Sequence, residues 1–130
     1  MEDRTLMEIA EKVRKTAYAP YSKFKVGCAL LAKSGKVYTG INIENASYSP
    51  TNCAERTAFF KAVSEGEREF EAIAICGGME EKADKICAPC GVCRQVMAEF
   101  CNGDFLIILG NVENFQRHTL SELLPLSFKL

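Results

Sequence analysis

The spacing of apolar residues along the chain changes several times. Residues 3–16 carry apolar side chains every three to four positions, which predicts an amphipathic helix. Its apolar face consists of Leu6, Ile9, Ala10, Val13 and Ala17. Two strand-like runs, 24–32 and 36–41, flank a turn at Ser34-Gly35 and predict a β-hairpin. Residues 42–52 are polar and irregular, and a loop of this length in a compact domain usually serves a function.

The second half of the chain alternates predicted helices with predicted strands. A helix is expected over 53–64, capped by Thr51 or Asn52 and ended by Gly66. The later segments are a strand over 70–76, a charged loop over 77–85, a helix over 90–100, a strand over 104–109, a short helix over 119–124 and a tail over 126–130. Strand–helix–strand units require parallel strands and right-handed crossovers. The sequence therefore predicts an α/β fold with a mixed sheet, as a single domain over 1–130.

Composition and charge narrow the class of protein. Hydrophobic residues make up 48% and charged residues 25%, which is typical of a globular chain. The net charge is −1 and the two signs are interspersed, so the chain lacks the basic stripe of a nucleic-acid-binding protein. A small, nearly neutral substrate is expected instead. No segment approaches the roughly 20 apolar residues of a membrane span, so no membrane partner is expected. The acidic, helical start is unlike a signal peptide and favours a cytoplasmic location.

Two short motifs carry the candidate chemistry. Cys53-Ala54-Glu55 reads as C-x-E, and residues 89–93 read as P-C-x-x-C. Together they form the zinc deaminase signature, with Cys where the usual form has His. If the two helices point their N-termini at one spot, Cys53, Cys90 and Cys93 supply three thiolates and leave the fourth tetrahedral position of Zn²⁺ to water. Glu55 would then contact that water.

Three thiolates would give the zinc centre a formal charge of −1, which weakens its effect on water. Arg56, three residues after Cys53, is the best candidate to compensate, by donating hydrogen bonds to the thiolates. Arg94, next to Cys93, is a weaker candidate for the same role.

Cys87 leaves an alternative open. With Cys53, Cys90 and Cys93 it would supply four thiolates, which would suit a closed structural zinc site or an iron–sulfur cluster. Cys87 precedes Pro89 and lies off the predicted helix, so three ligands are favoured. The other cysteines are interpreted as core residues in strands, Cys28 and Cys76, and as a helix-end thiol, Cys101. His118 lies outside both motifs and is interpreted as a surface or structural residue.

Over essentially its whole length, the chain resembles the small, homotetrameric, zinc-dependent cytidine deaminases of nucleoside salvage. The matching stretches are YSKFKVGCAL, GINIENASY, NCAERTAFFKA, PCGVCRQVM and LPLSF. The resemblance implies a three-layer α/β/α fold with a mixed, mostly five-stranded sheet. It also implies one Zn²⁺ per chain and a homotetramer with sites at subunit interfaces. The implied reaction is hydrolysis of cytidine and deoxycytidine to uridine and deoxyuridine plus ammonia.

The resemblance also assigns roles to individual residues. Cys53, Cys90 and Cys93 would bind zinc, and Glu55 would shuttle protons for a zinc-activated water. The implied substrate-binding residues are Phe24, Asn42, Glu44, Asn45, Ala46, Tyr48, Ala54 and Phe128. Without the resemblance, Phe24 fits an apolar core, Asn42 and Glu44 fit a solvated face, and Phe128 fits an anchor for the tail.

Three other functions remain as alternatives. A polynucleotide deaminase would need a basic channel. A nucleoside-antibiotic deaminase would share the zinc motifs but would lack the GINIENASY and YSKFKVG matches. A non-enzymatic zinc or redox protein would have no use for Glu55 beside the first ligand.

Overall fold

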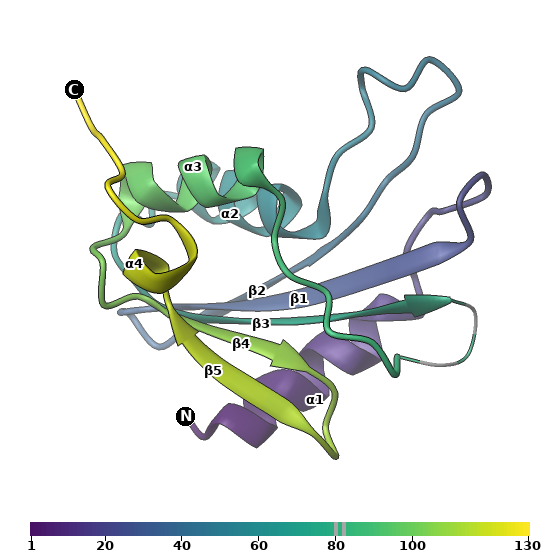
Figure 1. Cartoon of the computed structure of the whole chain (residues 1–130), viewed down its shortest axis with the longest axis horizontal. Helices are drawn as coiled ribbons and strands as arrows, with labels where there is room; N and C mark the ends of the chain where they lie inside the picture. The colour runs from purple at the N-terminus through teal and green to yellow at the C-terminus, as the bar shows by residue number, and fades with distance from the viewer. Residues whose placement is uncertain (80, 82) are drawn as a thin grey trace.

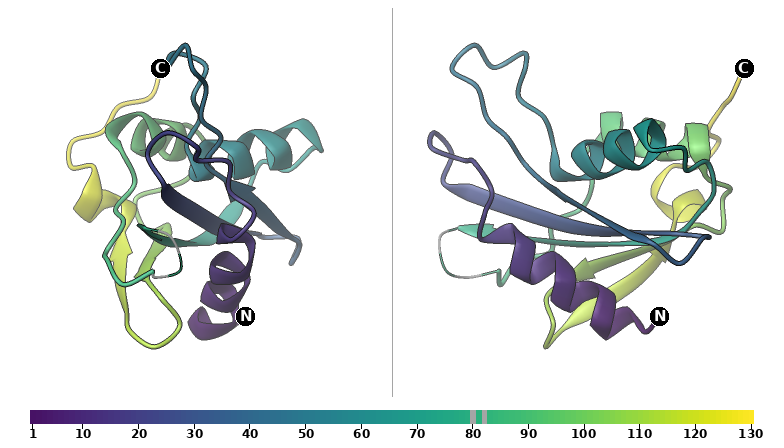
Figure 2. Two further views of the ribbon diagram at one scale, coloured as in Figure 1. Left: turned by 90° about the vertical axis from the view of Figure 1, so that its right-hand side faces the viewer. Right: turned by 180° about the vertical axis from the view of Figure 1, so that it is seen from behind.

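The computed structural model describes residues 1–79, 81 and 83–130. Five strands form one mixed sheet in the order β2-β1-β3-β4-β5. Helix α1 covers one face, and α2 and α3 cover the other (Figure 1). Figure 2 shows the same layers from the side and from behind. The three-layer α/β/α fold with a five-stranded mixed sheet is confirmed.

The elements alternate as the sequence predicted, with one further strand near the C-terminus. In chain order they are α1 (Asp3–Arg14), β1 (Phe24–Ala32), β2 (Val37–Ile41), α2 (Ala54–Ser64), β3 (Phe70–Met79), α3 (Gly91–Phe100), β4 (Leu106–Gly110), β5 (Phe115–Thr119) and α4 (Leu120–Leu123). Strand β1 pairs antiparallel with β2 and β3, and β4 pairs antiparallel with β5. Strands β3 and β4 are parallel, and α3 makes the crossover between them. Within the described ranges, no helix is long and apolar enough to cross a membrane.

Two strands differ from the sequence prediction. Strand β5 was not predicted, because it lies at the sheet edge and its central residues Gln116 and Arg117 are exposed, so it lacks an apolar run. Strand β3 continues to Met79, whereas the sequence predicted a charged loop from residue 77. These last residues pair with the first residues of β1, and that pairing extends the strand.

The buried face of α1 also differs from the prediction. Arg14 is only 2% exposed and takes a position inside the structure, whereas Val13 is partly exposed. The Arg14 guanidinium donates hydrogen bonds to the carbonyl of Lys25 at 3.1 Å and to that of Gly78 at 2.8 Å. An arginine can therefore occupy this buried position, because two strand carbonyls accept hydrogen bonds from its guanidinium. The helix ends at Arg14, two residues earlier than predicted.

The sheet separates two apolar clusters. The larger one lies under α2 and α3 and is centred on Phe59, whose ring contacts those of Phe70, Phe100 and Phe105. The smaller one lies under α1. Cys28 belongs to the first cluster and Cys76 to the second, so both predictions of a core cysteine are confirmed. His118 is partly exposed on β5 and its Nε2 lies 3.0 Å from Oε1 of Gln116, which agrees with a surface or structural role.

Candidate metal centre and active site

Three cysteine thiols meet where the N-termini of α2 and α3 converge. Cys53 is the N-cap of α2, Cys90 is the N-cap of α3, and Cys93 lies in the first turn of α3. Their three Sγ atoms lie within 4.8 Å of one another. Cys90 Sγ is 3.8 Å from Cys53 Sγ and 3.5 Å from Cys93 Sγ. The predicted convergence is confirmed, and the cluster can hold one metal ion with three thiolates and an open fourth position.

Cys53 and Cys90 lie just before the helices that were predicted to include them. Cys53 and Cys90 have extended backbones, with φ −76° and ψ 155° for Cys53 and φ −70° and ψ 169° for Cys90. The predicted caps of α2, Thr51 and Asn52, are wrong. Asn52 instead donates its Nδ2 to the Thr57 hydroxyl at 3.2 Å. Within a helix, the side chains of two residues that are two positions apart point about 200° away from each other. Cys53 is a cap and lies outside the regular helix, so this angle does not apply to Cys53 and Glu55.

Arg56 provides positive charge beside the thiols. Its Nη2 donates a hydrogen bond to Cys53 Sγ at 3.3 Å. A hydrogen bond from the Cys93 thiol, followed by the one from Arg56, lowers the pKa of Cys53 to about 5. Among the described residues, the buried Nε of Arg56 has no hydrogen-bond partner. A thiolate cluster with a cation against it is a donor set that fits Zn²⁺, because thiolates are soft ligands and the guanidinium offsets their negative charge.

Arg94 lies elsewhere. Its Nε donates to the carbonyl of Pro89 at 2.8 Å, and its Nη1 donates to the carbonyl of Leu123 at 2.6 Å. This side chain therefore fixes the start of α3 against the end of α4 instead of contacting the thiols.

Glu55 is buried close to the cluster. It lies in the first turn of α2 and is only 4% exposed. Burial, with a smaller contribution from the negative charge of the Cys53 thiolate, raises the pKa of its carboxyl to about 7. A carboxyl that titrates near neutral pH can both accept and donate a proton under working conditions.

Cys87 stays apart from the metal cluster. Among the described residues, Cys53, Cys90 and Cys93 are the cysteines whose sulfur atoms group closely enough for a metal ion. Cys87 packs against the larger apolar cluster, and burial raises the pKa of its thiol to about 12. The structure therefore does not bring together the four sulfur atoms of the four-thiolate site considered from the sequence.

The polar loop after β2 carries two side chains that are held at the start of β1. Asn42 accepts a hydrogen bond from the amide of Val26 and donates one to the carbonyl of Phe24, both at 2.8 Å. Glu44 accepts from the amides of Tyr21 and Ser22 at 3.0 and 3.1 Å, and also from the Ser22 hydroxyl. The Ser22 hydroxyl lowers the pKa of Glu44. An amide and a carboxylate have further donor and acceptor capacity, so both remain able to bind a ligand.

The tip of this loop borders a hollow of about 300 Å³, lined by Tyr21, Ser22, Glu44, Asn45, Tyr48 and Thr51. Tyr48 is 80% exposed and has a positive φ of 63°, and Ala46 is also exposed. Asn45 accepts a hydrogen bond from the amide of Ser47 at 2.9 Å. Ser22 and Thr51, which also line this hollow, were not predicted from the sequence as binding residues. Ser22 lies in the stretch YSKFKVGCAL that carries the family resemblance, and this position could have indicated a role at the site.

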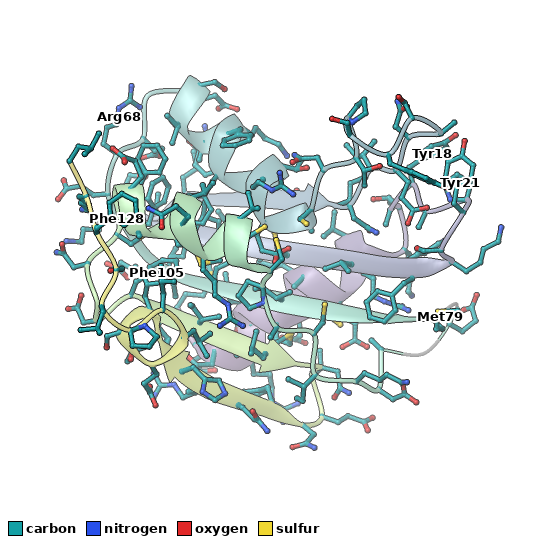
Figure 3. The ribbon with its side chains drawn as sticks, turned by 45° about the horizontal axis from the view of Figure 1, so that its top comes forward. Tyr18, Tyr21, Arg68, Met79, Phe105 and Phe128 are labelled. Atoms are coloured by element: carbon teal, nitrogen blue, oxygen red, sulfur yellow. The ribbon has the colours of Figure 1, made fainter. Side chains whose placement is uncertain are left out.

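The remaining substrate-binding candidates lie in different surroundings. Ala54 is buried as the first residue of α2, where a backbone N–H lacks a partner within the helix. Phe24 is partly buried against the larger apolar cluster. Phe128 is 67% exposed on the C-terminal tail, and Figure 3 shows it on the opposite side of the molecule from Tyr18 and Tyr21. Within one chain, Phe128 is therefore remote from the loop that holds Glu44.

Comparison with known proteins agrees with this geometry. Residues 1–109 match the family described as the cytidine and deoxycytidylate deaminase zinc-binding region. A cytidine deaminase from Sporosarcina psychrophila is 51% identical over 129 residues, which cover 98% of this chain and 92% of that protein. One from Halalkalibacterium halodurans is 52% identical, with 98% and 95% covered. The crystal structure of cytidine deaminase from Burkholderia pseudomallei matches with a TM-score of 0.89 and 46% identity, covering 98% of this chain and all of that one. The chain belongs to this family of zinc-dependent deaminases.

Proposed function

We propose that this protein hydrolyses cytidine and deoxycytidine to uridine and deoxyuridine plus ammonia. The observation that carries the proposal is a buried carboxyl, Glu55, close to a cluster of three cysteine thiols. Cys53, Cys90 and Cys93 would hold one Zn²⁺. When bound, zinc supplies an acidified water, with a pKa towards about 7. The family and its curated relatives at about half identity support cytidine as the substrate.

Glu55 would carry the protons of the reaction. It takes one proton from the attacking water and delivers it to ring nitrogen 3 while the oxygen bonds to carbon 4. It then takes the remaining proton of that oxygen and passes it to the amino nitrogen. The carbon–nitrogen bond breaks, ammonia leaves, and the oxygen stays as the carbonyl of the product. One carboxyl can act as base and then as acid because its pKa lies near neutral.

The loop residues would orient the nucleoside. Asn42 and Glu44 would hold the ribose hydroxyls, since an amide and a carboxylate offer both donors and acceptors to neighbouring hydroxyls. The backbone of Ala54 would bind the carbonyl oxygen of the base, and Phe24 would lie beside the pyrimidine ring. Asn45, Ala46, Tyr48 and Phe128 would complete sites shared between subunits of a homotetramer. The exposure of Tyr48 and Phe128 in the single chain supports that placement.

Arg56 would tune the metal centre. Its guanidinium already donates to Cys53 at 3.3 Å, and a positive charge there offsets the third thiolate. Arg56→Ala should lower both zinc affinity and turnover, and Arg56→Lys should recover only part of each, because a single ammonium cannot reproduce the planar donor fork. Unchanged zinc content and unchanged turnover in Arg56→Ala would remove this residue from the proposal.

The reaction is tested by following the oxygen atom. Purified protein is incubated with cytidine in ¹⁸O-labelled water, and the product is analysed by mass spectrometry. The proposal predicts uridine carrying one ¹⁸O and an equal amount of ammonia. Deoxycytidine should react similarly, whereas single-stranded DNA and the nucleoside antibiotic blasticidin S should not. Faster conversion of the antibiotic or of the polynucleotide than of cytidine would contradict the proposed substrate.

A role in pyrimidine salvage and a cytoplasmic location belong to the same proposal. A pyrimidine-requiring bacterium that lacks its own cytidine deaminase should grow on cytidine when this chain is produced in it. Growth should be lost with Glu55→Gln. Activity recovered outside the cytoplasmic fraction of lysed cells would contradict the location.

A further inference from the structure

The first turn of α2 rests directly on two small residues of the sheet. Gly40 of β2 and Cys28 of β1 are direct partners in the antiparallel register, so they lie side by side on one face. That face is the one covered by α2, and both residues are buried. Above them lies Ala54, which sits between Cys53 and Glu55 in the sequence.

Gly40 allows the backbone of α2 to lie closer to the sheet than any residue with a Cβ would allow. A Cβ placed on Gly40 would lie 2.2 Å from the Ala54 carbonyl oxygen and 2.7 Å from the Ala58 nitrogen. Ordinary carbon–oxygen contacts are about 3.3–3.6 Å. Both of these obstacles are helix backbone, which cannot rotate away as a flexible side chain can. A methyl group at this position would therefore lift the first turn of α2 by roughly 1 Å to restore an ordinary contact.

Cys28 holds the same carbonyl from the neighbouring strand. Its thiol donates to the Ala54 oxygen at 3.2 Å, and the side chain is completely buried. Burial raises the pKa of the thiol well above its usual value, so the proton needed for this bond stays in place. The metal cluster does not include Cys28.

We propose that Gly40 and Cys28 are positioning residues, which together set the height of the first turn of α2 above the sheet. That height fixes where Cys53 and Glu55 lie relative to Cys90 and Cys93, because the latter two come from a different helix. The expected effect on zinc binding depends on the geometry of the thiol cluster alone, whereas the expected effect on turnover rests on the proposed function.

The chain contains a matched control for Gly40. Gly27, next to Cys28 on β1, also lies under a helix, but on the opposite face and under α1. A Cβ there would lie 2.5 Å from both the Ala10 oxygen and the Arg14 nitrogen. Gly27→Ala therefore introduces the same kind of clash with helix backbone at a place remote from the thiols. If Gly40 had a purely structural role, both variants would show the same zinc affinity and the same Co²⁺ spectrum.

The test compares Gly40→Ala and Gly27→Ala in three measurements. Zinc affinity is measured by competition with a chromophoric chelator, the cluster geometry by the visible spectrum of the Co²⁺-substituted protein, and stability by thermal unfolding. Both variants should lose stability. Only Gly40→Ala should bind zinc at least about tenfold more weakly and shift the Co²⁺ bands. Its kcat should fall by about 10²-fold, since a 1 Å misplacement of a reacting group costs about that much, while KM changes little.

Two outcomes would overturn the inference. One is a folded Gly40→Ala variant with the zinc affinity and Co²⁺ spectrum of the unmodified protein. The other is a Gly27→Ala variant that disturbs both as much as Gly40→Ala does. If the unmodified protein fails to convert cytidine, the proposed function fails, but the zinc and Co²⁺ measurements still decide the positioning role.

Cys28 provides a second route if Gly40→Ala does not fold. Cys28→Ala removes the donor to the Ala54 carbonyl, whereas Cys28→Ser keeps a hydroxyl donor at the same place. We expect weaker zinc binding and lower kcat in Cys28→Ala, and recovery of most of both in Cys28→Ser. Equal zinc affinity in Cys28→Ala and the unmodified protein would contradict the inference, as would equal losses in both variants.

Discussion

Glu55 must ionise to accept a proton, although its burial disfavours the charged form. Its carboxyl is almost completely buried, which disfavours the charged form, and it stands next to thiols that become negative when they bind a metal. A carboxyl held near its titration point transfers protons in both directions at neutral pH. The burial that costs stability is therefore consistent with a role in proton transfer, and glutamine can test it because it has nearly the same shape and no titrating proton.

Glu55→Gln should retain one zinc per chain and lose activity by about 10²–10⁴-fold, which is the usual contribution of a positioned acid–base group. Zinc is measured by elemental analysis and turnover by the absorbance change of cytidine. Because glutamine keeps the volume of the side chain, the Co²⁺ spectrum should remain unchanged and serves as the control. Turnover at the rate of the unmodified protein would remove Glu55 from the mechanism.

The role of Cys87 can be separated from that of the three clustered cysteines. Its thiol packs against the apolar cluster and stays protonated near neutral pH, so Cys87→Ala should still bind one zinc per chain. Cys90→Ala, which removes a thiol from the cluster, is the matched comparison and should lose most of its zinc. Loss of metal in Cys87→Ala would restore the four-thiolate site considered from the sequence.

At the scale of elements, the helix N-termini organise the site, and this part was predictable. C-x-E and P-C-x-x-C are local patterns at the start of predicted helices, so the position of each cysteine at a helix start could be predicted. That the two starts converge was a condition of the predicted zinc site, and the structure meets it. Strand β5 was missed because an exposed edge strand shows no apolar run. The bonds that Ser22 makes to Glu44 join residues 22 positions apart, and no periodicity encodes such a contact.

Helix α4 shows a cap signal that the sequence argument overlooked. Thr119 and Glu122 form a capping box, in which each side chain bonds to the backbone of the other residue. The backbone amide of Thr119, followed by its hydroxyl, lowers the pKa of Glu122. A pKa that is lower in the folded state stabilises the protein above the unfolded pKa of about 4.3. This stabilisation is lost as the pH falls through the folded value.

Glu122→Gln should therefore be less stable than the unmodified protein at pH 7, and the difference should shrink as the pH falls below the unfolded pKa of about 4.3. The measurement is the urea midpoint of both proteins at a series of pH values and at equal zinc concentration. Glu113→Gln, which changes an exposed glutamate outside the capping box, is the control and should show no such convergence. A difference that stays constant from pH 7 to pH 3 would show that the charge of Glu122 does not stabilise the cap.

At the scale of the whole molecule, a single chain leaves apolar side chains without cover. Leu126, Phe128 and Leu130 on the tail are exposed, as is Tyr48 at the tip of the polar loop. Figure 1 shows the tail and this loop extending away from the body of the chain in different directions. Exposed apolar groups of this kind commonly mark surfaces that other chains cover. The homotetramer implied by the family resemblance would provide such cover.

Light scattering on the purified protein should therefore give a mass of about four times the chain mass of 14.4 kDa. Removing residues 126–130 should lower this mass or raise KM, because Phe128 and its neighbours would no longer reach an adjacent site. A point variant, Lys129→Ala, changes an exposed polar residue of the same tail and should leave both unchanged. A stable, fully active monomer would contradict sites shared between subunits.

Cytidine hydrolysis at a zinc site formed by Cys53, Cys90 and Cys93 can be tested on a single preparation of the protein. The most direct test measures zinc content and the loss of cytidine absorbance on the same preparation, before and after removal of metal and after its return. We expect one zinc per chain, with turnover that disappears when the metal is removed and returns in proportion to the zinc bound. One zinc per chain without conversion of cytidine, or conversion that persists in the metal-free protein, would contradict this expectation.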